Sequence, residues 1–193
     1  MGQRLNIEII ENGKVLANAY YHWSGYTSSS LELTQTILES IENFNYEDRI
    51  VNAIKLLEET GAGLTDDEIA YGKKYIKDFD KYSFIDCMGR NKGLIAISDK
   101  GIKETEFWEE ARVEIDLTTK IVNFKAIWES TKEELEIYYD DLKYDEIPIY
   151  DIKFNNIPFE KFTEFKDLIM NLIDNKIYEV RLSNDEKVYS FIE

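Results

Sequence analysis

The chain contains very few of the residues from which common metal sites and crosslinks are built. It has one Cys, Cys87, and one His, His22, among 193 residues. A single Cys excludes an intrachain disulfide and a thiolate metal cluster, and it suits a reducing compartment. His and Cys zinc sites cannot be assembled from these two residues, whereas an oxygen-ligand site for Ca²⁺ or Mg²⁺ stays open, although no Asp-rich calcium loop supports it. We therefore expect no metal and no cofactor.

Long apolar runs are also absent. The longest, such as 94–97 and 168–170, fall far short of the roughly 20 residues that a membrane span needs. The first residues show neither the apolar core nor the cleavage site of a signal peptide. Asn6 stands where an N-myristoylation motif needs Ser or Thr. These absences predict no membrane association and a cytoplasmic location, and they leave the oligomeric state undefined.

Proline and glycine are scarce as well. With 2 Pro, 9 Gly and 44% hydrophobic residues, the sequence shows no linker, no low-complexity tract and enough apolar material for one sizeable core. We expect a single α+β domain over residues 1–193.

Acidic residues outnumber basic residues in this chain. The 39 Asp and Glu against 23 Lys and Arg leave a formal net charge of -16. A surface this negative repels nucleic-acid phosphate and anionic lipid, and it attracts basic surfaces. The charge therefore argues against direct nucleic-acid binding and favours a basic protein surface as the partner.

Apolar periodicity predicts strands and helices in separate runs. An Asn-Gly turn at 12–13 joins two alternating segments into a hairpin. Helical spacing follows, and Thr65 with Glu68 forms a capping box at the start of a third helix. The expected elements are a hairpin over 5–23, helices over 33–44, 50–57 and 65–79, a meander with strands 84–88, 94–98, 113–117 and 121–128, a short acidic helix near 135–138, a strand over 149–154, a helix over 159–173 and a closing hairpin over 177–192.

This order predicts an α+β fold in which helices pack on the face of one or more antiparallel sheets. The same order resembles the αββα sandwich of N-terminal-nucleophile hydrolases. Those enzymes need a Ser, Thr or Cys at the mature N-terminus, whereas removal of Met1 would expose Gly2 here. The layout stays open as a fold alternative, and we expect no catalytic residue from it.

The densest acidic stretch, 129–151, holds nine acidic and two basic residues and is interleaved with Tyr. Such a surface can imitate a nucleic-acid phosphate ladder and occupy a basic groove, with Tyr as the amphipathic anchor. It can equally be a solvated face that keeps the protein soluble. The predicted partner-binding residues are Glu129, Glu133, Glu134, Glu136, Tyr138, Tyr139, Asp140, Asp141, Tyr144, Asp145 and Glu146.

The stretch from His22 to Ser30 is the alternative candidate site. It carries the chain's single His at a strand end that leads into a helix N-terminus. Such a junction can hold an anionic or nucleotide-like ligand through backbone donors and hydroxyls, or it can place His22 as a general base in a hydrolase. A structural hydrogen bond for His22 and capping by the serines is the simpler interpretation. The predicted ligand-binding residues are His22, Ser24, Tyr26 and Ser28.

The triplet Asp151-Ile152-Lys153, with Asp140 or Asp141 upstream, has the acid, acid-x-Lys pattern of metal-dependent nucleases. The pattern arises easily by chance in a chain rich in Asp and Lys, and the acidic field around it would repel the substrate. We therefore favour a non-enzymatic interaction protein over a nuclease.

The stretch from Gln3 to Leu31, with Tyr20-Tyr21-His22-Trp23-Ser24-Gly25-Tyr26, resembles the opening of uncharacterised proteins encoded by bacteriophages and prophages of low-GC Gram-positive bacteria. The resemblance implies a small accessory protein directed at a host or defence function, and it brings no catalytic residues. Together with the charge, it predicts a phage-encoded inhibitor that binds a basic surface of a nucleic-acid-handling or defence protein.

Overall fold

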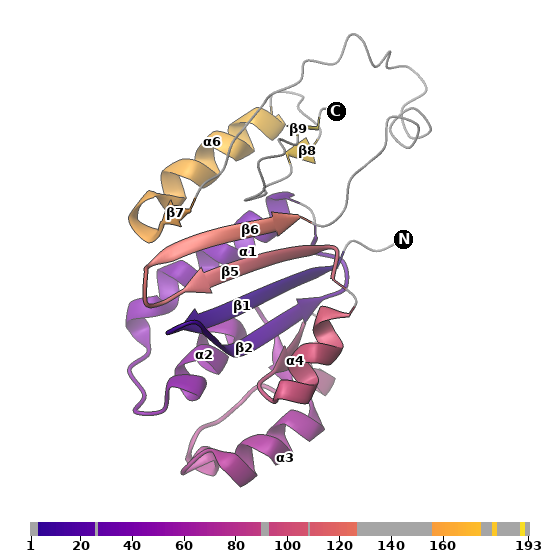
Figure 1. Cartoon of the computed structure of the whole chain (residues 1–193), viewed down its shortest axis with the longest axis vertical. Helices are drawn as coiled ribbons and strands as arrows, with labels where there is room; N and C mark the ends of the chain where they lie inside the picture. The colour runs from indigo at the N-terminus through magenta and orange to yellow at the C-terminus, as the bar shows by residue number, and fades with distance from the viewer. Residues whose placement is uncertain are drawn as a thin grey trace.

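A sheet of seven strands runs through the molecule, with helices on both of its faces (Figure 1). The computed structural model describes residues 4–25, 27–89, 93–107, 109–126, 156–174, 179–180 and 190–191. The strand order is β3-β4-β2-β1-β5-β6-β7, and a separate pair is formed by β8 and β9. The mixture of helices with a mostly antiparallel sheet confirms the predicted α+β class, and the seven strands lie side by side in one sheet.

The central hairpin joins β1 (Leu5–Glu11) to β2 (Lys14–Tyr21). Asn12 and Gly13 both have positive φ, 51° and 72°, as a tight hairpin turn requires. The hairpin confirms the prediction made from the Asn-Gly pair.

Two helices follow the hairpin. They are α1 (Thr27–Ser40), continued by the 3₁₀ turn η1 (Ile41–Asn43), and α2 (Arg49–Glu58). The carboxylate of Asp48 caps α2 by accepting hydrogen bonds from the N–H groups of Ile50 and Val51. Both helices confirm the helical spacing of the sequence.

The middle of the chain departs from the predicted meander. The short β3 (Gly63–Leu64) leads into α3 (Asp66–Tyr75) and the 3₁₀ turn η2 (Phe79–Lys81). The expected strand over 84–88 is wrong, because this segment forms one isolated bridge at Asp86 and the 3₁₀ turn η3 (Cys87–Gly89). After β4 (Leu94–Ala96), the chain forms a helix that the sequence did not predict, α4 (Asp99–Glu106), which buries only Ile102.

The last part of the sheet is β5 (Ala111–Asp116), β6 (Ile121–Ala126) and β7 (Ile157–Pro158). The 3₁₀ turn η5 (Phe159–Lys161) and α6 (Phe162–Asp174) follow. The pairing of β8 (Glu179–Val180) with β9 (Ser190–Phe191) agrees with the predicted closing hairpin. The acidic helix near 135–138 and the strand over 149–154 lie outside the described residues.

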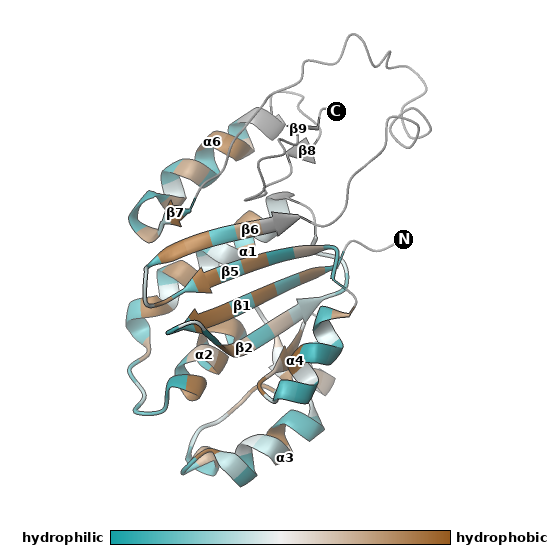
Figure 2. Ribbon diagram, in the orientation of Figure 1, coloured by the Kyte–Doolittle hydropathy of each residue, from teal (hydrophilic) through white to brown (hydrophobic). Residues whose placement is uncertain are grey.

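The two faces of the sheet differ in chemistry. Leu5, Ile7 and Ile9 of β1 are fully buried in a core shared with α1, α2 and α6. The alternate residues Asn6 and Glu8 point to the opposite face, where α4 packs, and they are buried as well. Figure 2 shows the alternation of hydrophobic and hydrophilic residues along β5.

Parallel pairing links distant parts of the chain. β1 pairs with β5 in parallel, with Glu8 opposite Glu114, and β3 pairs with β4 in parallel. The sheet is therefore mixed rather than purely antiparallel. None of the helices in the described ranges is both long and apolar enough to cross a membrane.

Candidate functional site

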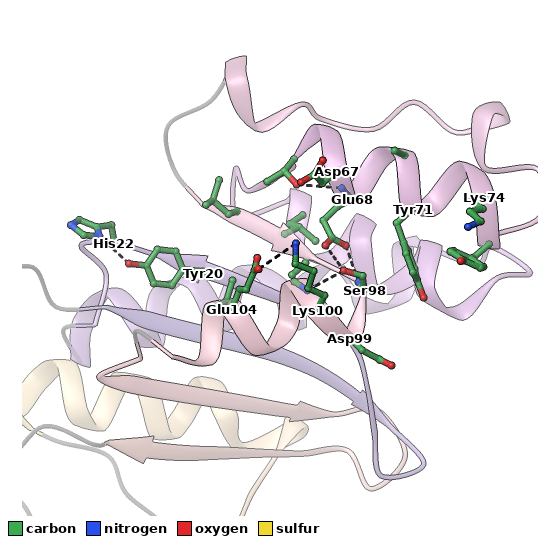
Figure 3. Close-up of a pocket in the computed structure, with 18 of the residues that line it drawn as sticks. Tyr20, His22, Asp67, Glu68, Tyr71, Lys74, Ser98, Asp99, Lys100 and Glu104 are labelled. Atoms are coloured by element: carbon green, nitrogen blue, oxygen red, sulfur yellow. Dashed lines mark hydrogen bonds and ion pairs between the residues drawn. The ribbon is translucent and has the colours of Figure 1, made fainter.

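A cleft of about 1180 Å³ opens between α3 and α4, with β4 as its floor (Figure 3). Its size suits a small organic ligand. The side chains that form it come from the end of the hairpin, from α3, from β4 and from α4: Arg4, Tyr20, His22, Thr65, Asp67, Glu68, Ala70, Tyr71, Lys74, Tyr75, Leu94, Ile95, Ala96, Ser98, Asp99, Lys100, Gly101, Glu104 and Thr105.

Three tyrosines give the cleft its aromatic character. Tyr71 and Tyr75 lie one turn apart on α3, with ring centroids 4.6 Å apart, and Tyr20 contributes a third ring from β2. Tyr75 is 60% exposed, and the Lys74 ammonium lies 4.8 Å from the centroid of its ring. Tyrosine rings offer large, rigid contact area together with a polar hydroxyl. The cleft can therefore hold a flat apolar group.

Glu68 connects the two helical walls of the cleft. Its buried carboxylate accepts hydrogen bonds from the N–H groups of Ile97 and Ser98, both at 2.8 Å, and from the Ser98 hydroxyl at 2.5 Å. The sequence predicts that Glu68 caps its own helix. Thr65 does accept a hydrogen bond from the Glu68 N–H, but the Glu68 carboxylate turns to the start of α4 instead.

Gly101 makes this connection possible. A Cβ at position 101 would collide with the carboxylate of Glu68, which approaches the first turn of α4 closely. The Ser98 hydroxyl in turn accepts a hydrogen bond from the Gly101 N–H at 3.0 Å and so caps α4. Because Glu68 and Ser98 occupy the start of α4, that helix end does not provide the anion site of this cleft.

The cleft is nearly neutral in a strongly acidic protein. It is lined by three basic and four acidic side chains: Arg4, Lys74, Lys100, Asp67, Glu68, Asp99 and Glu104. Asp67 and Glu68 lie in the first turn of α3 and Asp99 in the first turn of α4, where the helix dipole favours negative charge. The pair between Lys100 and Glu104, 3.5 Å apart, is exposed and weak. The Lys100 ammonium can therefore exchange Glu104 for a polar group of a ligand.

His22 lies at the hairpin end of the cleft. Its Nδ1 is 2.9 Å from the hydroxyl of Tyr20, and its ring contacts Trp23 edge to face at 4.7 Å. Burial raises the pKa of the Tyr20 hydroxyl, so this group stays protonated. When Tyr20 donates to Nδ1, the neutral imidazole carries its proton on Nε2 and can offer it to a ligand.

The structure separates the other residues of the predicted ligand site from the cleft. Ser24 and Ser28 do not line it, and the Ser24 carbonyl accepts a hydrogen bond from Ser30 at 3.2 Å. Tyr26 lies outside the described residues. His22 is thus the one described member of that predicted set in the cleft, and its hydrogen bond goes to Tyr20.

No family model, curated protein or solved structure matches this chain. The site is therefore identified from the shape and the side chains of the cleft alone.

The predicted partner-binding residues between 129 and 146, and the triplet at 151–153, lie outside the described residues. Among the residues that are described, no group of three or more His, Cys, Asp or Glu is placed to hold a metal ion.

A buried polar network adjoins the α4 wall of the cleft. The side-chain amide of Asn18 donates to the Thr105 hydroxyl at 2.6 Å and to Asn6 Oδ1 at 3.3 Å. Asn6 Nδ2 in turn donates to the Thr105 carbonyl at 3.2 Å and to Glu109 at 3.0 Å. These bonds fasten the last turn of α4 to the centre of the sheet.

Arg112 continues this network along the sheet. Its guanidinium forms a two-bond fork with the Glu109 carboxylate, both bonds at 2.7 Å, and its Nη1 lies 3.4 Å from Glu8 Oε1. Glu8 is 2% exposed, and its burial raises the pKa of its carboxyl to about 7.

Sequence reasoning missed most of the cleft. The start of its α3 wall can be predicted, because the sequence shows Thr65 as a capping residue. Its α4 wall begins at Ser98-Asp99, a capping pair that could have indicated a helix. Glu68 bonds to Ile97 and Ser98, which lie 29 and 30 positions further along the chain. A contact over that distance leaves no pattern among neighbouring residues of the sequence.

Proposed function

We propose that this protein binds a small nucleotide-like molecule, a flat ring joined to an anionic or polar group, in the cleft between α3 and α4. The observation that carries this proposal is the combination, in one concave site, of three tyrosine rings, an apolar floor on β4 and basic side chains on separate elements. Large apolar pockets with a few convergent polar groups are where small ligands bind.

The ring of the ligand packs against the pair of tyrosine rings on α3. Tyr71 and Tyr75 on α3 line the cleft together with Leu94 of β4, so a flat ring finds apolar contact area there. The anionic group has Lys74, Lys100 and Arg4 within the same cleft. The net charge of -16 opposes an anion at long range. Local donors must outweigh that field, so the ligand carries few charges.

Calorimetric titration tests this proposal with a defined panel. The panel contains the mononucleotides of adenine, guanine, cytosine and uracil, the matching uncharged nucleosides, and inorganic phosphate alone. We expect at least one nucleotide to bind, its nucleoside to bind more weakly, and phosphate alone to give no signal. Absence of binding by every nucleotide and nucleoside would reject the nucleotide-like class.

Matched variants locate the site. Tyr75→Ala removes an exposed ring from the cleft, whereas Tyr75→Phe retains the ring. We expect roughly ten-fold weaker binding for the first, the equivalent of about 1.4 kcal/mol, and near wild-type binding for the second. Lys100→Ala should weaken the nucleotide more than the nucleoside. Lys103→Ala, an exposed change on the same helix outside the cleft, is the control.

A second function is proposed from the charge of the sequence. The acidic stretch 129–151 is proposed to bind a basic surface of a nucleic-acid-handling or defence protein, as expected of a phage-encoded inhibitor. It is supported by nine acidic residues against two basic ones in this stretch. Such binding weakens as salt screens it.

A pull-down at low salt tests this second function. The basic partner should be released by about 0.5 M NaCl and lost on charge reversal of four residues: Glu133, Glu134, Asp140 and Asp141. The matched control reverses four exposed acids on other elements: Glu42, Glu47, Glu59 and Glu160. Equal loss with both sets would show that only total charge matters.

A further inference from the structure

Glu8 of β1 and Asn18 of β2 are directly opposed across the central hairpin. Opposed residues of an antiparallel pair point to the same face with their Cβ atoms about 5 Å apart. Both side chains are buried, Glu8 at 2% exposure and Asn18 at 0%. The Glu8 carboxyl and the Asn18 side-chain amide therefore lie next to each other beneath α4, shielded from solvent.

Each of these two residues presents a buried oxygen that receives no hydrogen bond within the described part of the chain: Glu8 Oε1 and Asn18 Oδ1. The orientation of the Asn18 amide follows from Thr105. The Thr105 hydroxyl donates to the Ile102 carbonyl at 2.7 Å, so it must accept from Asn18 Nδ2. The Asn18 side-chain oxygen, Oδ1, is therefore the atom of this amide that still needs a hydrogen-bond donor.

An ionised Glu8 carboxylate opposite this oxygen would place two acceptors together, which is costly in a buried site. Arg112 Nη1 lies 3.4 Å from Glu8 Oε1, but it makes no hydrogen bond to that oxygen. A protonated carboxyl removes the conflict, because its O–H can donate to Asn18 Oδ1. We infer that Glu8 is a buried protonation site whose O–H donates to Asn18 Oδ1 and keeps the Asn18 amide turned toward Thr105 on α4.

Loss of this proton to solvent reverses the arrangement. The Glu8 carboxylate then needs donors, and Arg112 Nη1 supplies one from 3.4 Å. The Asn18 amide supplies another by turning over, which directs its Nδ2 to Glu8 and its Oδ1 to Thr105. The Thr105 hydroxyl then releases the Ile102 carbonyl and donates to Asn18. The bond between Thr105 and Asn18 is kept with its direction reversed. The bond inside the last turn of α4 and the bond from Asn18 Nδ2 to Asn6 Oδ1 are given up.

The charges around Glu8 place this change in the neutral range. Arg112 and Glu114 face it from β5, Glu106 from α4 and Glu109 from the segment after α4, while β2 presents the uncharged Asn18. Burial is the largest influence and raises the pKa of Glu8 to about 7. Arg112 opposes the rise, and the three acids add to it.

Thr105 carries the effect to the cleft, because it both accepts from Asn18 and lines the cleft. This step alone rests on the proposed function. Protonation of Glu8 thereby sets the position of the α4 wall, and ligand binding becomes dependent on pH.

Nuclear magnetic resonance of the ligand-free protein tests the inference. The carboxyl carbon of Glu8, the side-chain amide of Asn18 and the backbone amides of Gly101 to Glu106 are followed between pH 5 and 8. We expect all three sets to titrate with one midpoint near 7. In Glu8→Gln, which supplies a permanent N–H donor, the Asn18 and α4 titrations should disappear. Glu32→Gln, an exposed change on α1, should leave them intact.

Three outcomes are distinguished in the wild-type protein alone, so the test does not depend on folding of the variant. A shared midpoint near 7 supports the inference. A Glu8 midpoint below about 5, where an unperturbed carboxyl titrates, overturns the protonation site. A Glu8 midpoint near 7 with unchanged Asn18 and α4 signals overturns the coupling. Since no ligand is present, failure of the nucleotide titrations leaves each outcome readable.

Discussion

Glu68 binds Ser98 twice, through the backbone N–H at 2.8 Å and the side-chain hydroxyl at 2.5 Å. The buried Glu68 carboxylate accepts a third hydrogen bond from the Ile97 N–H. This contact is what holds α3 and α4 as two walls around the cleft.

Glu68→Ala should destabilise the protein strongly. The change leaves two buried backbone N–H groups without an acceptor and removes the acceptor of the Ser98 hydroxyl, which together cost about 3 kcal/mol. The urea unfolding midpoint measures this loss. Asp67→Ala, an exposed change in the same turn, is the control and should cost less than about 0.5 kcal/mol. Equal losses in the two variants would show that Glu68 does not hold the two walls together.

Gly101→Ala should reverse the usual effect of alanine in a helix. At an ordinary helical position, this change stabilises by about 1 kcal/mol. Here the new methyl meets the Glu68 carboxylate, which three hydrogen bonds hold in place, so we expect destabilisation by about 1 to 3 kcal/mol. The double variant with Glu68→Ala removes the obstacle. In that background Gly101→Ala should become stabilising, and strict additivity of the two changes would disprove the contact.

The sequence predicts those parts of the fold that depend on near neighbours. Asn12 and Gly13 fix a hairpin because the turn needs positive φ at both positions. The capping bond of Thr65 is equally local. α4 escaped prediction because Ile102 is its single buried residue, so it lacks an apolar stripe.

The site depends on distant pairs, which is why the sequence reveals little of it. Glu8 looks like an ordinary solvent-facing residue of an alternating strand, yet α4 covers that face of the sheet and buries it. His22 was found by its residue type, and it does lie in the cleft. The serines near it in sequence point elsewhere, because the chain turns into α1 after the strand ends.

Cys87 should react slowly with alkylating reagents. Burial raises the pKa of its thiol, and Asp86 and Asp66 raise it further, so the reactive thiolate is scarce. The rate with iodoacetamide at pH 8 should be below that of the same protein unfolded in urea. Asp86→Asn should accelerate the reaction, and Asp80→Asn, an exposed change, should not. A native rate above the unfolded one would contradict this expectation.

Glu8 should make the protein less stable as the pH rises toward neutrality. The folded-state pKa of Glu8 is raised from 4.5 to about 7. Between these two values the folded state holds a proton that the unfolded state has released, so the free energy of unfolding falls as pH increases through this window and levels off above about 7. The full shift corresponds to a loss on the order of 3 kcal/mol.

Glu8→Gln isolates this contribution, because every other carboxyl titrates in both proteins. The two proteins should have similar stability near pH 5, where Glu8 is protonated in the folded state. Toward pH 8 the variant should become the more stable one, since it buries an amide where the wild type buries a charge. Urea unfolding at closely spaced pH values gives the difference curve. A difference that stays constant between pH 5 and 8 would mean that Glu8 is ionised throughout and that Arg112, 3.4 Å away, outweighs its burial.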